Sequence, residues 1–153
     1  MNYNYMHLTI SHAEGMFRIE SESFSDPWTK ESIISSLENP LNLTVGSFDS
    51  TGELCGFVCA TVIPPEAEIL NIAVLGSHRQ KGIGQALLNS MLSELKNDFS
   101  VDTVFLEVRE SNIPARSLYT KFGFEVIGAR SRYYSNPTED AILMAKNLDN
   151  YLI

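Results

Sequence analysis

Asn71-Ile-Ala-Val-Leu-Gly-Ser-His-Arg-Gln-Lys-Gly-Ile-Gly-Gln-Ala-Leu-Leu88 is the stretch around which the rest of the chain is organised. The apolar run from Ile69 to Leu75 predicts a buried strand. A glycine-rich loop follows, and apolar residues then recur at the spacing of a helix. These residues are Ile83, Leu87, Leu88, Met91, Leu92 and Leu95. The loop therefore lies where a strand passes into the N-terminus of a helix.

This loop has the features of an anion-binding site. Backbone N–H groups in the first turn of a helix lack partners within the helix, and the helix dipole favours an anion there. Gly82 and Gly84 allow a phosphate to approach the backbone, while Arg79 and Lys81 add positive charge. A plain surface turn is the alternative interpretation. The loop is not a Walker loop, because no Gly-Lys-Ser/Thr follows, and the dinucleotide pattern Gly-x-Gly-x-x-Gly is incomplete.

Length and composition indicate one globular domain, residues 1–153. Hydrophobic residues make up 44% of the chain and charged residues 20%, which is ordinary for a soluble protein. No apolar stretch reaches the roughly 20 residues of a membrane helix, and the N-terminus lacks the features of a signal peptide. We therefore expect a cytoplasmic protein with no membrane partner.

The net charge is −8, from 11 basic and 19 acidic residues. An acidic domain is poorly suited to direct nucleic-acid binding, which requires phosphates to be neutralised. It fits a basic polypeptide or an amine substrate better, although solubility alone explains such a charge equally well.

The cysteines and histidines indicate neither a disulfide nor a metal site. Cys55 and Cys59 fall in one predicted strand, which separates their Cα atoms by about 13 Å, too far for a disulfide. His7, His12 and His78 are scattered along the chain, and no cluster of His and Cys is present. We expect packing roles for the cysteines and no bound metal.

The order of elements predicts an α/β fold. Ser11 and Glu14 form a capping-box pattern, Pro114 suits a first helical turn, and Gly123 suits a helix end. The expected strands are 5–10, 41–48, 53–63, 68–75, 101–108, 124–129 and 141–145, and the expected helices are 11–24, 29–38, 82–97 and 112–122, with a polar loop at 130–140. This order favours a mixed, mostly antiparallel central sheet flanked by helices on both faces.

Four residues could carry chemistry or line a substrate cleft, and each has a structural alternative. Glu107 is a carboxylate in an apolar strand, so it is either a candidate general base or half of an ion pair with Arg109 or Arg130. Tyr119 is either a core aromatic or an acid for a leaving thiolate, because a phenol is protonated at neutral pH. Asn112 precedes a helix, where it serves as a cap or also contacts a cofactor. Trp28, the single tryptophan, is a core anchor or a cleft wall.

The string Asn71-Ile72-Ala73-Val74, followed by Arg79-x-x-Gly82-x-Gly84, resembles the acetyl-CoA pyrophosphate loop of the GNAT N-acetyltransferase superfamily. The resemblance implies that the loop N–H groups bind the pyrophosphate of CoA. It also implies that the preceding strand pairs with the pantetheine arm and offers an N–H to the thioester oxygen. The family usually has an Asp-Pro-like turn after this strand, whereas this chain has Leu75-Gly76-Ser77. The implied cofactor contacts are Ile72, Ala73, Val74, Arg79, Gln80, Lys81, Gly82, Ile83, Gly84, Gln85 and Asn112.

Three further strings are similar to the RimI-type ribosomal-protein-alanine N-acetyltransferases. They are Leu106-Glu-Val-Arg-x-Ser-Asn112, Ala115-x-x-Leu-Tyr-x-x-x-Gly-Phe124 and Arg132-Tyr-Tyr134. The resemblance covers about residues 5 to 146. It implies that Glu107 is the base and Tyr119 the acid in acetyl transfer from acetyl-CoA to the N-terminal alanine of a small-subunit ribosomal protein. Loops often carry specificity, so we expect the walls of the peptide cleft at Trp28, Tyr133 and Tyr134.

Two other functions share parts of this pattern. A GNAT enzyme for another protein N-terminus, a polyamine or a small antibiotic would have the same cofactor motifs. A CoA-binding partner protein without turnover would need neither Glu107 nor Tyr119, so their presence favours an enzyme.

Overall fold

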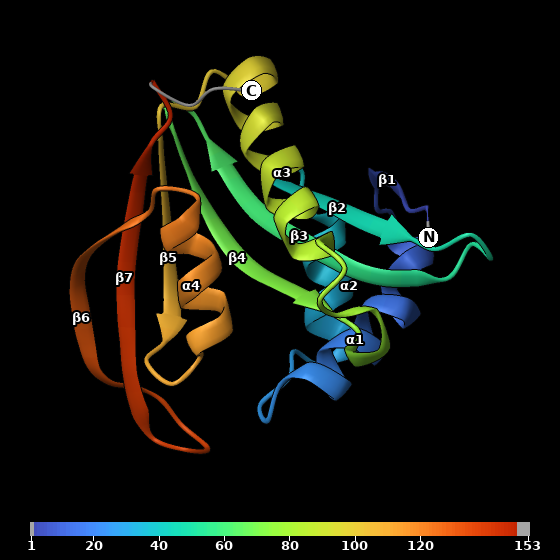
Figure 1. Ribbon diagram of the computed structural model, residues 1–153, viewed down its shortest axis with the longest axis horizontal. Helices are drawn as coiled ribbons and strands as arrows, with labels where there is room; N and C mark the ends of the chain where they lie inside the picture. Colours follow the sequence, from blue (N-terminus) through green and yellow to red (C-terminus); the bar gives the residue numbers. More distant parts are fainter. Residues whose placement is uncertain (1, 150–153) are drawn as a thin grey trace.

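The computed structural model describes residues 2–149, so residues 1 and 150–153 of the predicted domain lie outside the description. The strands and α-helices follow one another in the predicted order (Figure 1). In chain order they are β1 (Asn4–His7), η1 (Ile10–His12), α1 (Ala13–Ser23), α2 (Lys30–Glu38), β2 (Asn42–Phe48), β3 (Leu54–Ile63), β4 (Glu66–Val74), η2 (Gly76–His78), α3 (Ile83–Phe99), β5 (Thr103–Arg109), α4 (Ile113–Lys121), β6 (Glu125–Tyr134) and β7 (Glu139–Asn147).

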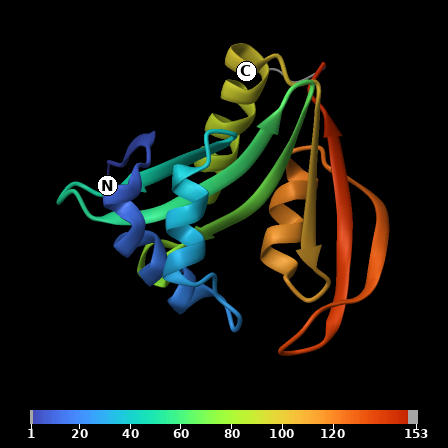
Figure 2. The ribbon, with the colours of Figure 1, turned by 180° about the vertical axis from the view of Figure 1, so that it is seen from behind.

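One sheet of seven strands organises the described chain, in the order β1-β2-β3-β4-β5-β7-β6. Only β4 and β5 pair in parallel, and every other neighbouring pair is antiparallel. Helices α3 and α4 lie over one face (Figure 1), and α1 and α2 over the other (Figure 2). The predicted mixed, mostly antiparallel sheet with helices on both faces is confirmed.

The sheet opens between β4 and β5. Their parallel pairing begins at Glu66 and Thr103 and ends at Ile69 and Leu106, although both strands continue. The pairing of β3 with β4 shifts between Cys59 and Ala60, next to the point where β4 leaves β5. The carboxyl-terminal ends of β4 and β5 therefore separate, as Figure 1 shows, and a cleft forms at the separation.

The residues predicted to begin and end α4, and the two cysteines of β3, have the structures expected from the sequence. The Asn112 side chain accepts the N–H of Ala115 at 3.3 Å, and Pro114 lies in the first turn. Gly123, which follows the helix, has φ +91°, the left-handed conformation that glycine adopts at low cost. Cys55 and Cys59 are free and buried, as predicted.

Two predictions about element boundaries are wrong. The capping box at the first helix is not formed by Ser11 and Glu14. Instead, the N–H of Thr9 bonds to Nδ1 of His12 at 2.9 Å, a short 3₁₀ turn precedes the helix, and α1 begins at Ala13. The polar loop predicted at 130–140 is mostly strand, because β6 continues to Tyr134 and β7 begins at Glu139.

Within the described residues, no helix combines the length and the apolar character that crossing a bilayer requires.

Candidate functional site

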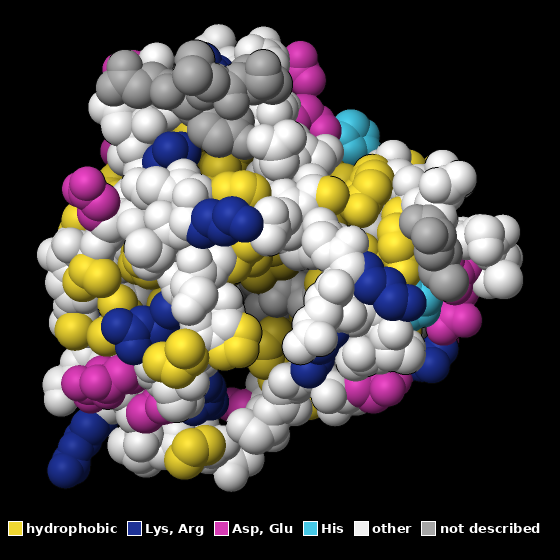
Figure 3. Space-filling model, in the orientation of Figure 1, with side chains coloured by type: hydrophobic (Ala, Val, Ile, Leu, Met, Phe, Trp, Pro, Cys, Tyr) yellow, Lys and Arg dark blue, Asp and Glu magenta, His cyan; other side chains and the backbone are white. Residues whose placement is uncertain are grey.

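A cleft of about 900 Å³ occupies the separation of β4 and β5. Its walls are the ends of these two strands, the loop between α1 and α2, the loop before α3, and α4. Figure 3 shows the surface hollowed in the middle of this face, between α4 and the loop that precedes α3. This cleft therefore brings together the glycine-rich loop and most of the residues singled out in the sequence.

The loop before α3 can bind an anion. Gly82, which caps α3, has φ +79°, and a Cβ atom at this position would meet nothing within 4 Å. Gln80 also has a positive φ, 62°. The first N–H groups of α3 lack partners within the helix and point out of its N-terminus. Arg79 lies beside them, and its Nε donates to the carbonyl oxygen of Val74 at 2.9 Å.

The strand β4 presents its backbone to the same cleft. The N–H of Leu75 bonds to the carbonyl of Cys55 in β3 at 2.8 Å. Since successive N–H groups of a strand alternate in direction, the N–H of Val74 points away from β3 and toward the cleft. An extended ligand with hydrogen-bonding groups can therefore pair with this edge of β4.

Tyr119 reaches the cleft from α4. The residue is buried, with 4% of its surface exposed, and its ring packs against Phe124. Burial raises the pKa of its phenol above the ordinary value near 10, so the hydroxyl stays protonated at neutral pH. No described residue makes a hydrogen bond to this hydroxyl, so a ligand in the cleft has no protein group to displace from it.

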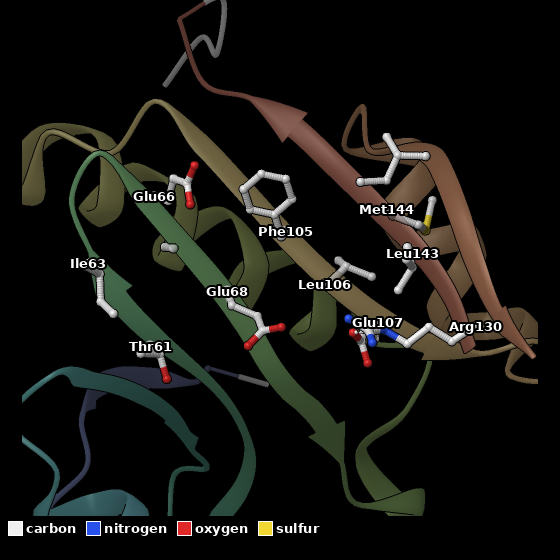
Figure 4. Close-up of a pocket in the computed structure, with 12 residues that line it drawn as sticks. Thr61, Ile63, Glu66, Glu68, Phe105, Leu106, Glu107, Arg130, Leu143 and Met144 are labelled. Atoms are coloured by element: carbon white, nitrogen blue, oxygen red, sulfur yellow. Dashed lines mark ion pairs between the residues drawn. The ribbon is translucent and has the colours of Figure 1, made fainter. Parts of the chain in front are cut away.

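Glu107 lies where the large cleft meets a second cavity of about 380 Å³. Its carboxylate forms an ion pair with Arg130, with Oε1 2.9 Å from Nε, and Figure 4 shows the two side chains meeting at one end of this cavity. Of the two partners that the sequence left open, Arg130 is therefore the one the structure selects. Burial, followed by the charge of Glu107, raises the pKa of Glu68 on the neighbouring strand. The lining of the second cavity thus contains the carboxylates of Glu68 and Glu107 and the exposed guanidinium of Arg130.

Arg109 instead holds the turn between β6 and β7. Its guanidinium donates to the carbonyls of Ser135 and Pro137, at 2.8 and 2.9 Å, and to Glu139 at 3.1 Å. It also lies over the ring of Tyr134, 4.5 Å from the centroid. The hydroxyl of Ser25, in the loop between α1 and α2, donates to the carbonyl of Asn136 in this turn at 3.0 Å. The two loops beside the cleft are therefore linked.

The family model described as "Acetyltransferase (GNAT) family" matches residues 13–124. This match spans most of the chain and includes the glycine-rich loop, Glu107 and Tyr119. The chain belongs to the GNAT family of acetyltransferases.

Individual relatives agree with this assignment. The ribosomal protein bS18-alanine N-acetyltransferase of Haemophilus influenzae is 36% identical over 137 residues, 86% of this chain and 90% of that protein. The crystal structure of the ribosomal-protein-S18-alanine N-acetyltransferase from Escherichia coli has a TM-score of 0.89 at 29% identity, covering 99% of this chain and 100% of that chain. The structure of Arabidopsis thaliana NAA60 in complex with acetyl-CoA is 19% identical and shares the fold, with a TM-score of 0.87 over 97% of this chain and 100% of that chain.

Most of the site residues predicted by the GNAT resemblance lie together. Trp28 and Tyr134 line the large cleft with Glu107 and Tyr119. Tyr133 does not. The residue is 54% exposed, and its ring lies beside Arg130 and the ring of Tyr134, so Tyr133 is outside the lining of the cleft. Lys81 is exposed and is also absent from the cleft lining. The predicted cofactor contacts that line the cleft are Ile72, Ala73, Val74, Arg79, Gln80, Gly82, Ile83, Gly84, Gln85 and Asn112.

Sequence reasoning missed Glu20, a GNAT-cleft residue on α1 with only 1% of its surface exposed. Burial raises its pKa to about 7, despite hydrogen bonds from Trp28 and Asn71 that lower it. The signal was present in the helical spacing. Glu20 stands four residues after Met16 and one after Ile19, which are both fully buried. A carboxylate on the apolar side of a helix indicates a buried charge with dedicated partners.

Proposed function

We propose that this chain transfers the acetyl group of acetyl-CoA to the α-amine of the N-terminal alanine of ribosomal protein bS18. The relatives that it resembles over most of their length are named for this reaction. A ribosomal acceptor makes the cytoplasm the expected compartment.

The observation that carries the proposal is the position of Glu107 between two cavities. A transferase with two substrates must bring a donor and an acceptor to one point from different directions. The larger cavity contains the anion-binding loop, which suits the donor, and its walls at Trp28 and Tyr134 suit the peptide that carries the acceptor amine. The smaller cavity has three acidic side chains in its lining, Glu66, Glu68 and Glu107, against the single basic side chain of Arg130, so its excess of negative charge suits a positively charged amine. Glu107 is then adjacent to the acceptor nitrogen and also open to the donor side.

The residues of the larger cleft fit acetyl-CoA. Gly82 and the N-terminus of α3 leave room for phosphate groups and direct N–H donors toward them. The edge of β4, which has left β5 at this level, offers backbone groups to an extended arm. When bound there, acetyl-CoA supplies the acetyl group as a thioester.

Three groups of the chain then have complementary roles. Glu107 accepts the proton of the acceptor ammonium, directly or through a water, which frees the nitrogen lone pair for attack on the acetyl carbon. The N–H of Val74 donates to the oxygen on which negative charge develops. Tyr119 donates its proton to the departing sulfur as the carbon–sulfur bond breaks. An α-amine near pKa 8 loses its proton more readily than a lysine near 10.4, which favours an N-terminal acceptor.

Steady-state transfer to a peptide with the N-terminal sequence of bS18 tests the role of Glu107. We expect Glu107→Gln to lower kcat by about 10²-fold or more, with the Kd for acetyl-CoA little changed, because the variant keeps the shape but cannot accept a proton. Arg132→Ala serves as the control, since this exposed residue of β6 is absent from the lining of both cavities. Unchanged kcat in Glu107→Gln would exclude Glu107 as the base.

A further inference from the structure

Glu20 joins three parts of the fold through one buried carboxylate. It lies on α1, and its Oε1 accepts the backbone N–H of Trp28, in the loop before α2, at 2.9 Å. Its Oε2 accepts Nδ2 of Asn71 on β4. The amide oxygen of Asn71 in turn accepts the N–H of Ile72 at 3.0 Å. Both donors to Glu20 are neutral, and no ion pair within residues 2–149 includes it.

These contacts lie at the wall of the cleft. Glu20, Trp28 and Asn71 all line it, and Trp28 also packs against the core. The residue after Trp28, Thr29, caps α2 by accepting the N–H of Ser32 at 3.1 Å. The bond from Trp28 to Glu20 therefore fixes the loop at the point where it enters α2, and the bond from Asn71 fixes β4 against the same carboxylate.

Only an ionised carboxylate satisfies this arrangement fully. A carboxylate has two acceptor oxygens and can receive Trp28 and Asn71 together. A protonated carboxyl group has one good acceptor and one hydroxyl donor, so one of the two N–H groups loses its acceptor. Glutamine has the same limitation, because its amide has one acceptor oxygen and one NH₂ group. The Glu20→Gln variant therefore has, at every pH, the hydrogen-bonding capacity of the protonated carboxyl group.

We propose that Glu20, as a carboxylate, is a positioning residue that holds Trp28 and β4 in the arrangement that receives the acceptor peptide. The inference deepens the proposed function and rests on it for the identity of the acceptor. The structural part, that the ionisation of Glu20 controls the position of Trp28, does not depend on the reaction.

The surroundings of Glu20 make its ionisation measurable near neutral pH. Its pKa is raised to about 7, first by burial and only partly compensated by the two hydrogen bonds. Cys59 on β3 is the titratable neighbour whose own pKa is raised by the charge of Glu20, after burial. The other charged or titratable side chains in the cleft lining are Asp26, His78, Arg79, Glu107, Arg109, Tyr119 and Tyr134.

Fluorescence of the single tryptophan, Trp28, tests the structural part directly. We expect the emission of the wild-type protein to change between pH 5.5 and 8.5 with a midpoint near 7. Glu20→Gln should give a flat profile at the low-pH signal of the wild type. Glu22→Gln, a change on the same helix at an exposed residue paired with Arg18, should titrate like the wild type. A transition that persists in Glu20→Gln, or a wild-type protein without a transition, would overturn the proposal.

A second variant keeps the test decisive if Glu20→Gln does not fold. Asn71→Ser removes one donor to the ionised carboxylate, so the fluorescence midpoint should move to higher pH. A midpoint equal to that of the wild type would show that Glu20 is not the titrating group.

Kinetics test the consequence for the acceptor. At pH 8, Glu20→Gln should raise the KM for the acceptor peptide about tenfold, with kcat and the KM for acetyl-CoA within about twofold of the wild type. The ratio of the acceptor KM of Glu20→Gln to that of the wild type should approach one as the pH falls below 6. The wild-type carboxyl is then protonated and, like glutamine, has only one good acceptor oxygen. A ratio that does not change with pH, or a loss confined to kcat, would contradict a positioning role. If the wild-type protein transfers no acetyl group to the peptide, the proposed function fails, and the fluorescence result still decides the structural part.

Discussion

Removing the hydroxyl of Tyr119 is the simplest way to separate a chemical role of this residue from a structural role. The ring is buried, but the hydroxyl makes no hydrogen bond within the described residues. Tyr119→Phe therefore removes a proton donor without breaking an internal contact. We expect kcat to fall about 10²-fold, while the free energy of unfolding changes by less than about 1 kcal/mol.

Thiol release and urea unfolding, measured on the same preparation, check both expectations. Full kcat in Tyr119→Phe would mean that water or another group protonates the sulfur. A large loss of stability would mean that the hydroxyl has a structural partner.

At the scale of single residues, the sequence singled out most of the side chains that line the cleft but did not predict their contacts. Glu107 stood out because a charge interrupts an apolar strand, and its partner was narrowed to two arginines. The choice of Arg130 depends on β6 and β7 lying beside β5, which spacing along the chain does not reveal. Glu20 was missed because its neighbours Ser21, Glu22 and Ser23 made that part of α1 look like a polar surface.

Single elements were predicted well where apolar residues repeat and poorly at the sheet edge. Strand β6 is the last strand of the sheet, and nearly all of its residues are exposed. No alternation of apolar and polar residues marks such a strand, and Arg130 to Tyr134 therefore appeared to be a loop. Its pairing with β7 is also irregular between Arg130 and Tyr134, where Arg132 has φ 52°. Backbone pairing with β7 forms this strand despite its polar sequence.

The loop before α3 allows a matched pair of glycine substitutions. Gly82 has a positive φ, whereas Gly76, in the same loop, does not, and a Cβ at either position has open space in the protein alone. Gly82→Ala should cost about 1 kcal/mol of stability through its left-handed backbone. It should also weaken CoA binding about tenfold, because the added methyl would lie where we propose that the phosphates of CoA bind.

Calorimetric titration with CoA checks this prediction. Gly76→Ala should bind CoA within about twofold of the wild type and keep its stability. Equal affinities for CoA in the Gly82→Ala variant and the wild type would contradict the placement of the phosphates at the N-terminus of α3.

For the whole molecule, the sequence predicted the order of elements and the layers but not the opening in the sheet. The cleft exists because β4 and β5 stop pairing after Ile69 and Leu106. β4 remains rich in apolar residues beyond Ile69, so its composition does not mark where the strands part. In β5 the charged residues Glu107 and Arg109 follow this point, but they were interpreted as site or ion-pair residues and not as the end of the pairing. The shift in the pairing of β3 with β4, between Cys59 and Ala60, lies at this point, but it is visible only in the structure.

The buried carboxyl of Glu20 should make the stability of the whole molecule depend on pH. In the unfolded chain this group titrates near 4.5, and in the folded protein its pKa is about 7. Between these values the folded state binds more protons, so the free energy of unfolding falls as the pH rises. The loss is roughly 3 kcal/mol across this range. Glu20→Gln lacks this contribution, and its stability relative to the wild type should therefore increase by about that amount from pH 4.5 to pH 7.5.

Urea unfolding of both proteins at several pH values measures this difference. A difference that stays constant with pH would show that Glu20 has the same pKa in the folded and unfolded states.

The central claim is that the acceptor is the α-amine of an N-terminal alanine, and the location of the acetyl group tests it most directly. Purified bS18 with a free N-terminal alanine and the same protein with a blocked N-terminus would each be incubated with the enzyme and acetyl-CoA. Peptide mass spectrometry would then locate the added acetyl groups. We predict one acetyl group on the α-amine of the free protein and none on the blocked protein. Acetylation of lysines in the blocked protein would contradict the assignment and leave a GNAT acetyltransferase with a different acceptor.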